Sequence, residues 1–362
     1  MDELVIVEQD EGVSSAAARA MPWAIAVFLT ISIAGLYYVK WSPYFHKALA
    51  AAAQHTIGAS IITGKSAAPP GAGWQAAWSF AVAYFNAVWQ ALIVGLLIGS
   101  GVQVLLPRAW LARVLGQKGF LSTVIAGGAS VPSMMCTCCA APVAVGLGKS
   151  RASTGATVAY WLGNPILNPA TMVFTGFVLG WHWVALRIVA GMTLVLGVAY
   201  LAERTSVTRR VAANPPVGRA IGDVDGGGSL IVRWAQALWQ LSVGLIPEYI
   251  IIVLGLGAIR AWIFPALNPV IGHSLPLMLL LAVVGTLFVV PTAGEIPIVQ
   301  TLMAFGLGAG GAAVLLTTLP SLSFPSLLMM GKVVPGRVLV LAAAAVACIG
   351  LLAGGAAQLL GF

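Results

Sequence analysis

The chain has 362 residues, of which 60% are hydrophobic and 8% charged, and its mean hydropathy is +0.98. Soluble globular domains carry about a quarter charged residues, so the composition argues against a soluble protein and predicts one with many membrane spans. The formal charge of +8 does not indicate a nucleic-acid-binding protein, because most basic residues fall in short connections between apolar runs, where the positive-inside rule accounts for them.

The amino-terminal region, 1–73, is predicted to hold a tail, a first transmembrane helix and an external segment. Residues 1–12 contain five acids and no base, whereas a cleaved signal peptide begins with a basic segment. The apolar run 22–39 therefore predicts a retained transmembrane helix. Residues 40–73 are mixed in character and favour a short surface helix over a further span.

Two regions of similar plan follow. In the first, 74–202, a long apolar run precedes a basic loop, a cysteine-containing segment, a run interrupted by "GNPILNP" and another helix. Residues 203–233 are polar and glycine-rich, which predicts a cytoplasmic linker. The second region, 234–362, repeats the plan with a helix, a proline-broken segment at 274–305, a glycine-rich run and a final helix.

A spacing match supports a duplication. Pro142, Gly155 and Pro165 recur as Pro297, Gly310 and Pro320, with 13 and 23 residues separating the second and third from the first in both sets. We predict an all-α polytopic membrane protein of two inverted repeats, each with a proline-broken re-entrant hairpin. Duplicated transporters have this organisation.

The basic residues support hairpins that return to their own side of the membrane. With the linker in the cytoplasm, the loops 107–118, 149–151 and 332–337 also lie inside and carry seven lysines or arginines. The external side then carries Lys40, Lys47, Lys65 and Arg260. If the cysteine segment crossed the membrane fully, the loop 107–118 would lie outside and the charge bias would be lost. We expect a multi-pass protein of the cytoplasmic (inner) membrane.

Broken backbone at membrane depth is tolerated only inside protein or beside a wet cavity, so the two broken segments predict the substrate site. The alternative is that proline and glycine merely kink helices for packing, as in "GLLIG" (95–99) and "GFVLG" (176–180). Prolines cluster with small polar side chains here, which favours a site. The predicted substrate-lining residues beside the thiols are Ser133, Pro142, Asn164, Asn168, Ser321 and Ser323.

One intramembrane acid belongs to the second broken segment. Glu295 lies two residues before Pro297, and its counterpart in the first repeat is Ala140, next to Cys139. A carboxylate within a span is costly and therefore a functional candidate, so we predict a proton-coupling role for Glu295. Glu248 is the other acid within an apolar run, and an interfacial position explains it as well.

Three thiols, Cys136, Cys138 and Cys139, are the residues with the strongest chemistry. Cys136 and Cys138 would share a face in an extended segment, and Cys136 and Cys139 would do so on a helix. Thiolates select soft species such as Cu(I), Zn, trivalent arsenicals and mercury, so the three are candidate metal or metalloid ligands. The alternative is three small residues that pack in a helix bundle.

The stretch "CTCCAAPVAVGLGKSRASTGATVAYWLGNP" resembles the signature of the ArsP-type predicted permease family, and "GEIPIVQTLMAFGLGAGGAAV" is similar to its second repeat. The resemblance covers the chain from about residue 78 onward. It implies a permease of about eight to ten helices and, for characterised members, efflux of trivalent organoarsenicals. Cys136 and Cys138 match the cysteines of the family motif, and Pro142 matches its proline.

We therefore expect a permease rather than an enzyme, with membrane lipid and a small metalloid substrate as its partners and no cofactor or nucleic acid. The oligomeric state stays open, with a homodimer as one arrangement. No G-x-x-x-x-G-K-[ST] motif is present, so energy must come from an ion gradient or a partner. Two alternatives remain: a permease for a small sulfur-containing or anionic solute, and a membrane thiol–disulfide electron carrier.

Overall fold

The structure is a computed structural model that describes residue 23 and residues 25–62, 71–106, 108–117, 119–206, 230–263 and 274–362. Every long regular element in these ranges is a helix, which confirms the all-α prediction. Six helical stretches are long and apolar enough to cross a membrane: Ile25–Gln54, Trp74–Val104, Trp181–Thr205, Leu230–Ile259, Ala309–Met330 and Gly336–Leu359. The predicted tail and most of the predicted linker lie outside the described residues.

The first helix is longer than the sequence predicts. It runs from residue 25 through a π turn, η1 (Tyr37–Trp41), directly into α2 (Ser42–Gln54), and the whole stretch qualifies as one candidate span. The predicted short helix after residue 40 is present as α2, but it continues the first helix and does not stand apart from it. Pro43 follows the wider π turn, in which the Ser42 N–H donates five residues back to the Tyr37 carbonyl, so the chain passes a proline inside the long helix without a break.

The remaining elements fall into two series that match in order. The first series is α3 (Trp74–Val104), α4 (Arg108–Val114), α5 (Phe120–Ser130), η2 (Val131–Ser133), α6 (Thr137–Lys149), α7 (Thr154–Ile166), α8 (Pro169–Val178) and α9 (Trp181–Ser206). The second is α10 (Leu230–Ile263), α11 (Leu275–Leu287), α12 (Glu295–Ala304), α13 (Ala309–Ser321), α14 (Phe324–Met330) and α15 (Gly336–Leu359). Both α5 and α11, and both α7 and α13, begin 155 residues apart (275 − 120 and 309 − 154), which is also the spacing of the matched prolines.

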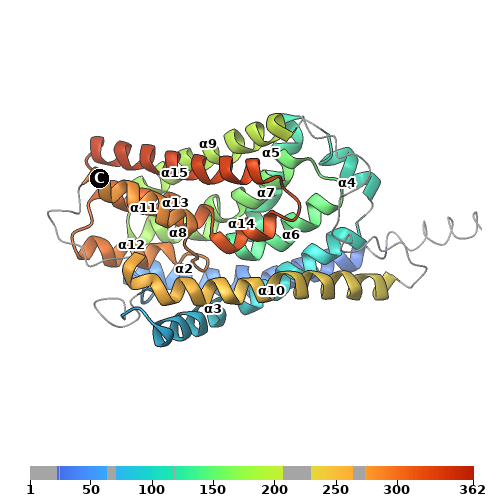
Figure 1. Cartoon of the computed structure of the whole chain (residues 1–362), viewed down its shortest axis with the longest axis horizontal. Helices are drawn as coiled ribbons and strands as arrows, with labels where there is room; N and C mark the ends of the chain where they lie inside the picture. Colours follow the sequence, from blue (N-terminus) through green and yellow to red (C-terminus); the bar gives the residue numbers. More distant parts are fainter. Residues whose placement is uncertain are drawn as a thin grey trace, which may run out of the picture.

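The last helices of the two series, α9 and α15, pack against each other in opposite directions (Figure 1). The N–H of Gly155, at the start of α7, donates to Glu203 near the end of α9. Gly310, at the start of α13, lies against Gln358 near the end of α15. The ring of Phe362, just after α15, contacts Trp183 at the start of α9. The end of α15 therefore lies beside the start of α9, and the two helices are antiparallel. These contacts support the predicted inverted repeat, which itself stays a prediction.

The helix breaks lie beside the matched prolines rather than at them. Pro142, Pro165 and Pro320 are inside helices, and the breaks fall at 131–136 and 167–168 in the first series and at 288–294 and 322–323 in the second. The break at 167–168 lies within the "GNPILNP" stretch, which is where the sequence predicts an interruption.

Glycines bring α3 against α6, the helix that carries the cysteines. A Cβ on Gly95 would overlap the carbonyl oxygen of Cys139, and a Cβ on Gly99 would overlap that of Pro142. The "GLLIG" stretch is therefore a close-packing face, as small residues four apart often are in membrane helices. In the "GFVLG" stretch, by contrast, a Cβ on Gly176 would meet the ring of Trp181, the first residue of α9, and not the backbone of a distant helix.

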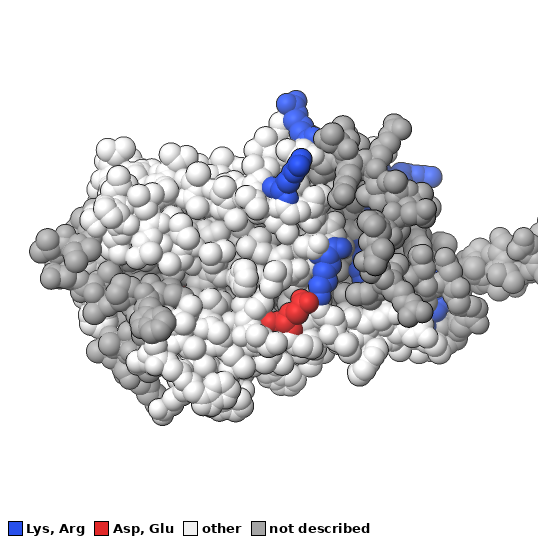
Figure 2. Space-filling view, in the orientation of Figure 1, with Lys and Arg blue, Asp and Glu red and all other residues white. Residues whose placement is uncertain are grey.

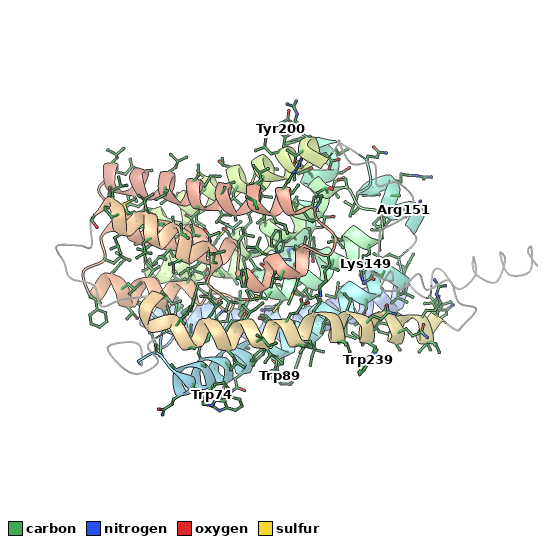
Figure 3. All side chains as sticks on the ribbon, viewed as in Figure 1. Trp74, Trp89, Lys149, Arg151, Tyr200 and Trp239 are labelled. Atoms are coloured by element: carbon green, nitrogen blue, oxygen red, sulfur yellow. The ribbon has the colours of Figure 1, made fainter. Side chains whose placement is uncertain are left out.

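Charged side chains gather at one end of the visible face. Figure 2 shows the lysines and arginines of this face, with one acidic group, between its middle and the end where α4 and the start of α10 lie, and no charged group on the other residues described there. Lys149 and Arg151 lie at this end, whereas Trp74 lies toward the other (Figure 3). Trp89 and Trp239 are exposed on the side of the bundle between the ends. An apolar belt with one basic end is what the positive-inside rule predicts for a membrane protein.

Candidate functional site

The first break, 131–136, is held by side chains that satisfy its exposed backbone. The Asn164 Oδ1 accepts from the Met135 N–H at 2.8 Å, and its Nδ2 donates to Ser133 Oγ at 2.5 Å. The Trp41 indole N–H, from the π turn of the first helix, donates to the Pro132 carbonyl at 2.7 Å. Buried backbone groups without partners are costly, so these bonds stabilise the break. Asn164 and Ser133 thus form a structural pair in this conformation.

The break ends at the thiols, because α6 begins directly after Cys136, which occupies the N-cap position. The Cys136 and Cys139 sulfurs are 3.2 Å apart, and both side chains are buried. Of the two arrangements that the sequence allows, the structure therefore has the helical one, in which Cys136 and Cys139 share a face. Residues at the N-cap and at the third helical position lie on the same side of a first turn, which places these two sulfurs together.

Cys138 points into a chain of hydroxyl groups. The Tyr84 hydroxyl donates to the Cys138 sulfur at 3.5 Å and accepts from the Tyr249 hydroxyl at 2.6 Å. Ser323 Oγ lies 3.4 Å from the same sulfur and 3.0 Å from Thr137 Oγ1. This polar chain joins α3, α10, α6 and the start of α14, so Cys138 connects the two series.

Asn168 and Ser323 occupy matching places, 155 residues apart, as N-caps of α8 and α14. The Asn168 Oδ1 accepts from two N–H groups of the first turn of α8, and its buried Nδ2 has no hydrogen-bond partner among the described residues. Ser323 forms a reciprocal capping pair with Ser326. Ser321 instead bonds back to the Thr317 carbonyl of its own helix, at 2.5 Å. Of these predicted residues, Ser323 is therefore the one that contacts the cysteine helix.

Glu295, the first residue of α12, forms a buried ion pair that the sequence analysis missed. Arg187 Nη1 donates to Glu295 Oε1 at 2.8 Å, and both side chains are about 1% exposed. The other guanidinium nitrogens donate to the carbonyls of Pro165 and Ile166 at 3.0 Å. Pro169 has no N–H, so it cannot satisfy the Pro165 carbonyl as the fourth residue of a continuing helix would, and Arg187 does so instead.

The signal for Arg187 was present in the sequence: a single cation inside the apolar run of α9. Glu248 differs from Glu295, because it lies on the surface and pairs with Lys332 at 3.2 Å. The interfacial reading of Glu248 is the one that the structure favours.

Two cavities lie on either side of the second break, and Cys136 lines the smaller one. The larger, of about 560 Å³, is an open cleft lined by the first helix, α3, α8 and the second break. The smaller, of about 10 Å³, lies between Cys136 and Glu295 and is also lined by Pro165 and Pro320, one from each half. Pro291, Thr292 and Ala293 line both cavities, so the second break separates the open cleft from the thiols. Ligand sites of transporters lie at such junctions of broken helices.

The described residues contain no group of three or more His, Cys, Asp or Glu side chains placed to hold a metal ion. The three cysteines as metal ligands thus stay a prediction. Two neighbouring sulfurs, of which that of Cys136 lines the small cavity, fit a substrate that needs two thiols better than a tetrahedral metal centre, which takes four ligands.

Comparison with known proteins places this fold in a family. A family model described as "Predicted permease" (ArsP_1) matches residues 22–144 and 132–359. The chain belongs to the ArsP-type predicted permease family. It is 48% identical over 346 residues to UPF0718 protein YraQ of Escherichia coli (strain K12), which covers 96% of this chain and 98% of the relative.

A second relative is more distant. The chain is 22% identical over 306 residues to UPF0718 protein MJ0584 of Methanocaldococcus jannaschii, which covers 67% of this chain and 84% of the relative. No solved structure matches. Membership in a permease family and the six candidate spans together support a multi-pass membrane transport protein.

Proposed function

We propose that this permease exports a small thiol-reactive solute, a trivalent organoarsenical, along a path between its two halves. The observation that carries the proposal is the pair of sulfurs 3.2 Å apart, one of which belongs to Cys136 and lines a cavity to which both halves contribute. A cysteine pair that served packing alone would not need a broken helix and a cavity beside it. Ser323 and the N-cap of α8 would line the path, and Ser321 and Pro142 would shape it from their helices.

The binding step needs no external reactant. For methylarsenite, CH₃As(OH)₂, each thiol displaces one hydroxyl group: two As–S bonds form, two As–O bonds break, and the thiol protons leave with the hydroxyls as two waters. The reverse exchange releases the substrate. Because Cys136 begins a helix and Cys139 lies one turn on, the pair presents both sulfurs to one arsenic atom without a change of helix geometry.

The direction of transport and its energy source would depend on an ion gradient. Glu295 is the candidate for proton coupling, and its pairing with Arg187 suggests how coupling would reach the path: protonation of the carboxylate would release Arg187, which also holds the end of α7. If Glu295→Gln leaves the pH dependence of transport unchanged, the coupling role is lost.

The experiment that tests the proposal is accumulation of methylarsenite in everted membrane vesicles. We expect uptake by the wild type and background uptake by Cys136→Ser/Cys139→Ser, since neither remaining oxygen can replace a thiolate for a soft centre. Cys348→Ser is the matched control, because Cys348 is exposed on α15 and away from the break. Wild-type vesicles that accumulate none would refute the arsenical substrate.

A permease for a small anionic solute is the second candidate, favoured by the two lysines that line the open cleft. Flux of an anion that survives removal of both thiols would favour it over arsenical export.

A further inference from the structure

The π turn of the first helix carries a lysine that the proposed arsenical chemistry does not use. Lys40 lies within the candidate span Ile25–Gln54 and is 4% exposed. Single π turns inside α-helices occur often at functional sites, and a charged residue within a span is a functional candidate. The same turn contacts both breaks: Trp41 binds the Pro132 carbonyl, and Lys40 binds Thr292.

The charge of Lys40 has no counter-ion in the part of the chain that the structure describes. Its Nζ donates to the hydroxyls of Tyr44 and Thr292, both at 3.0 Å, and its ammonium lies 5.1 Å from the centre of the Tyr44 ring. Three acidic side chains are described, and each is engaged elsewhere: Glu203 with Gly155, Glu248 with Lys332 and Glu295 with Arg187. A buried charge without an opposite charge is costly, so an anion bound beside Lys40 would be favoured.

The polar side chains at this site, Lys40, Tyr44 and Thr292, can all donate a hydrogen bond to a bound acceptor. An ammonium has three N–H donors, and the two described bonds leave one. The Tyr44 and Thr292 hydroxyls accept from Lys40, so each keeps its own hydrogen to donate. Lys40, Tyr44 and Thr292 all line the open cleft, together with the exposed Lys47. None of the residues that line this cleft is an aspartate or glutamate.

We propose that Lys40, Tyr44 and Thr292 form a binding site for a small oxyanion at the mouth of the permeation path. Oxygen acceptors of an anion would take the third Lys40 N–H and the two hydroxyl hydrogens, and Lys47 would attract the anion into the cleft. Charge-assisted bonds of this kind are the stronger ones in proteins. The site goes beyond the proposed arsenical export, gives the second candidate function its binding residues, and does not depend on the thiols.

Isothermal titration of the purified full chain with sodium phosphate, in a nonionic detergent and at an ionic strength held constant with sodium chloride, tests this site. We expect saturable binding by the wild type and binding at least about tenfold weaker in Lys40→Met, which keeps the length and removes the charge. Lys149→Met is the matched control, because it removes the same charge from a residue that does not line the cleft, and its affinity should equal that of the wild type.

Tyr44→Phe/Thr292→Val is a second test that keeps Lys40 and removes both hydroxyls, and it decides the matter if Lys40→Met does not elute as folded protein. We again expect a loss of about tenfold or more. Absence of saturable phosphate binding by the wild type, or equal affinity in the wild type and in folded Lys40→Met or the double variant, would overturn the proposal.

Free phosphate and a lipid phosphate share the recognising chemistry, and a competition arm separates them. Short-chain phosphatidylglycerol added to the micelles should displace phosphate if a lipid headgroup is the natural occupant, and should not if a free oxyanion is. Cys136→Ser/Cys139→Ser should bind phosphate as the wild type does. The anion site and the arsenical site can therefore fail independently of each other.

Discussion

The buried pair between Arg187 and Glu295 makes a quantitative prediction about stability. Arg187→Met leaves a buried carboxylate without its cation and two carbonyls, of Pro165 and Ile166, without donors. Removing one partner of a buried ion pair costs about 3–5 kcal/mol. Glu295→Gln should cost less, about 1.5–3 kcal/mol, because the guanidinium keeps both carbonyls and the amide oxygen can still accept.

The double variant separates the pair from its surroundings. Once Glu295 is neutral, loss of Arg187 no longer strands a charge, so Arg187→Met/Glu295→Gln should be less destabilised than the sum of the single variants by at least about 1 kcal/mol. The assay is reversible unfolding in mixed dodecyl maltoside and SDS micelles, followed by circular dichroism. Glu248→Gln is the control, because its half-exposed pair with Lys332 should contribute under about 1 kcal/mol. Additive effects, or an Arg187→Met cost no larger than that of the control, would refute the reasoning.

The packing and the break make further predictions in the same assay. Gly99→Ala places a methyl group onto the Pro142 carbonyl and should destabilise by about 1–3 kcal/mol, whereas Gly128→Ala, with open space around the new Cβ, should be neutral or stabilise by up to about 1 kcal/mol. Equal effects of the two would contradict the close approach of α3 and α6. Asn164→Leu leaves the buried Met135 N–H without a partner and should cost about 1–3 kcal/mol. An Asn164→Leu protein as stable as the wild type would show that the break is held by other means.

The apolar runs predicted most of the helix positions, because the length of a span and the low charge within it are local properties of the chain. The first helix is the exception. Pro43 and Lys40 favour an end to the helix at residue 40, and a π turn with side-chain partners from distant segments lets it continue. Those partners are 252 residues away in the case of Thr292, so no local pattern could reveal them.

The candidate site, too, could be predicted from local sequence features only in part. The broken helices could be predicted from the clustered cysteines, the flanking proline and the matched second segment. The structure places Cys136 and Glu295, one from each broken segment, at one cavity. Which two thiols meet depended on where α6 begins, and the sequence left both arrangements open. The partner of Glu295 is Arg187, 108 residues away on α9. A single arginine in an apolar run indicates a functional or structural role, but the sequence does not show which residue it pairs with.

Arsenic K-edge absorption on purified protein loaded with methylarsenite tests the thiol pair most directly. We predict two sulfur neighbours and one carbon for each bound arsenic in the wild type, one sulfur in Cys139→Ser, and an unchanged spectrum in Cys348→Ser. Bound arsenic with no sulfur neighbour in the wild type, in a protein that still transports the compound, would contradict the proposed role of the pair.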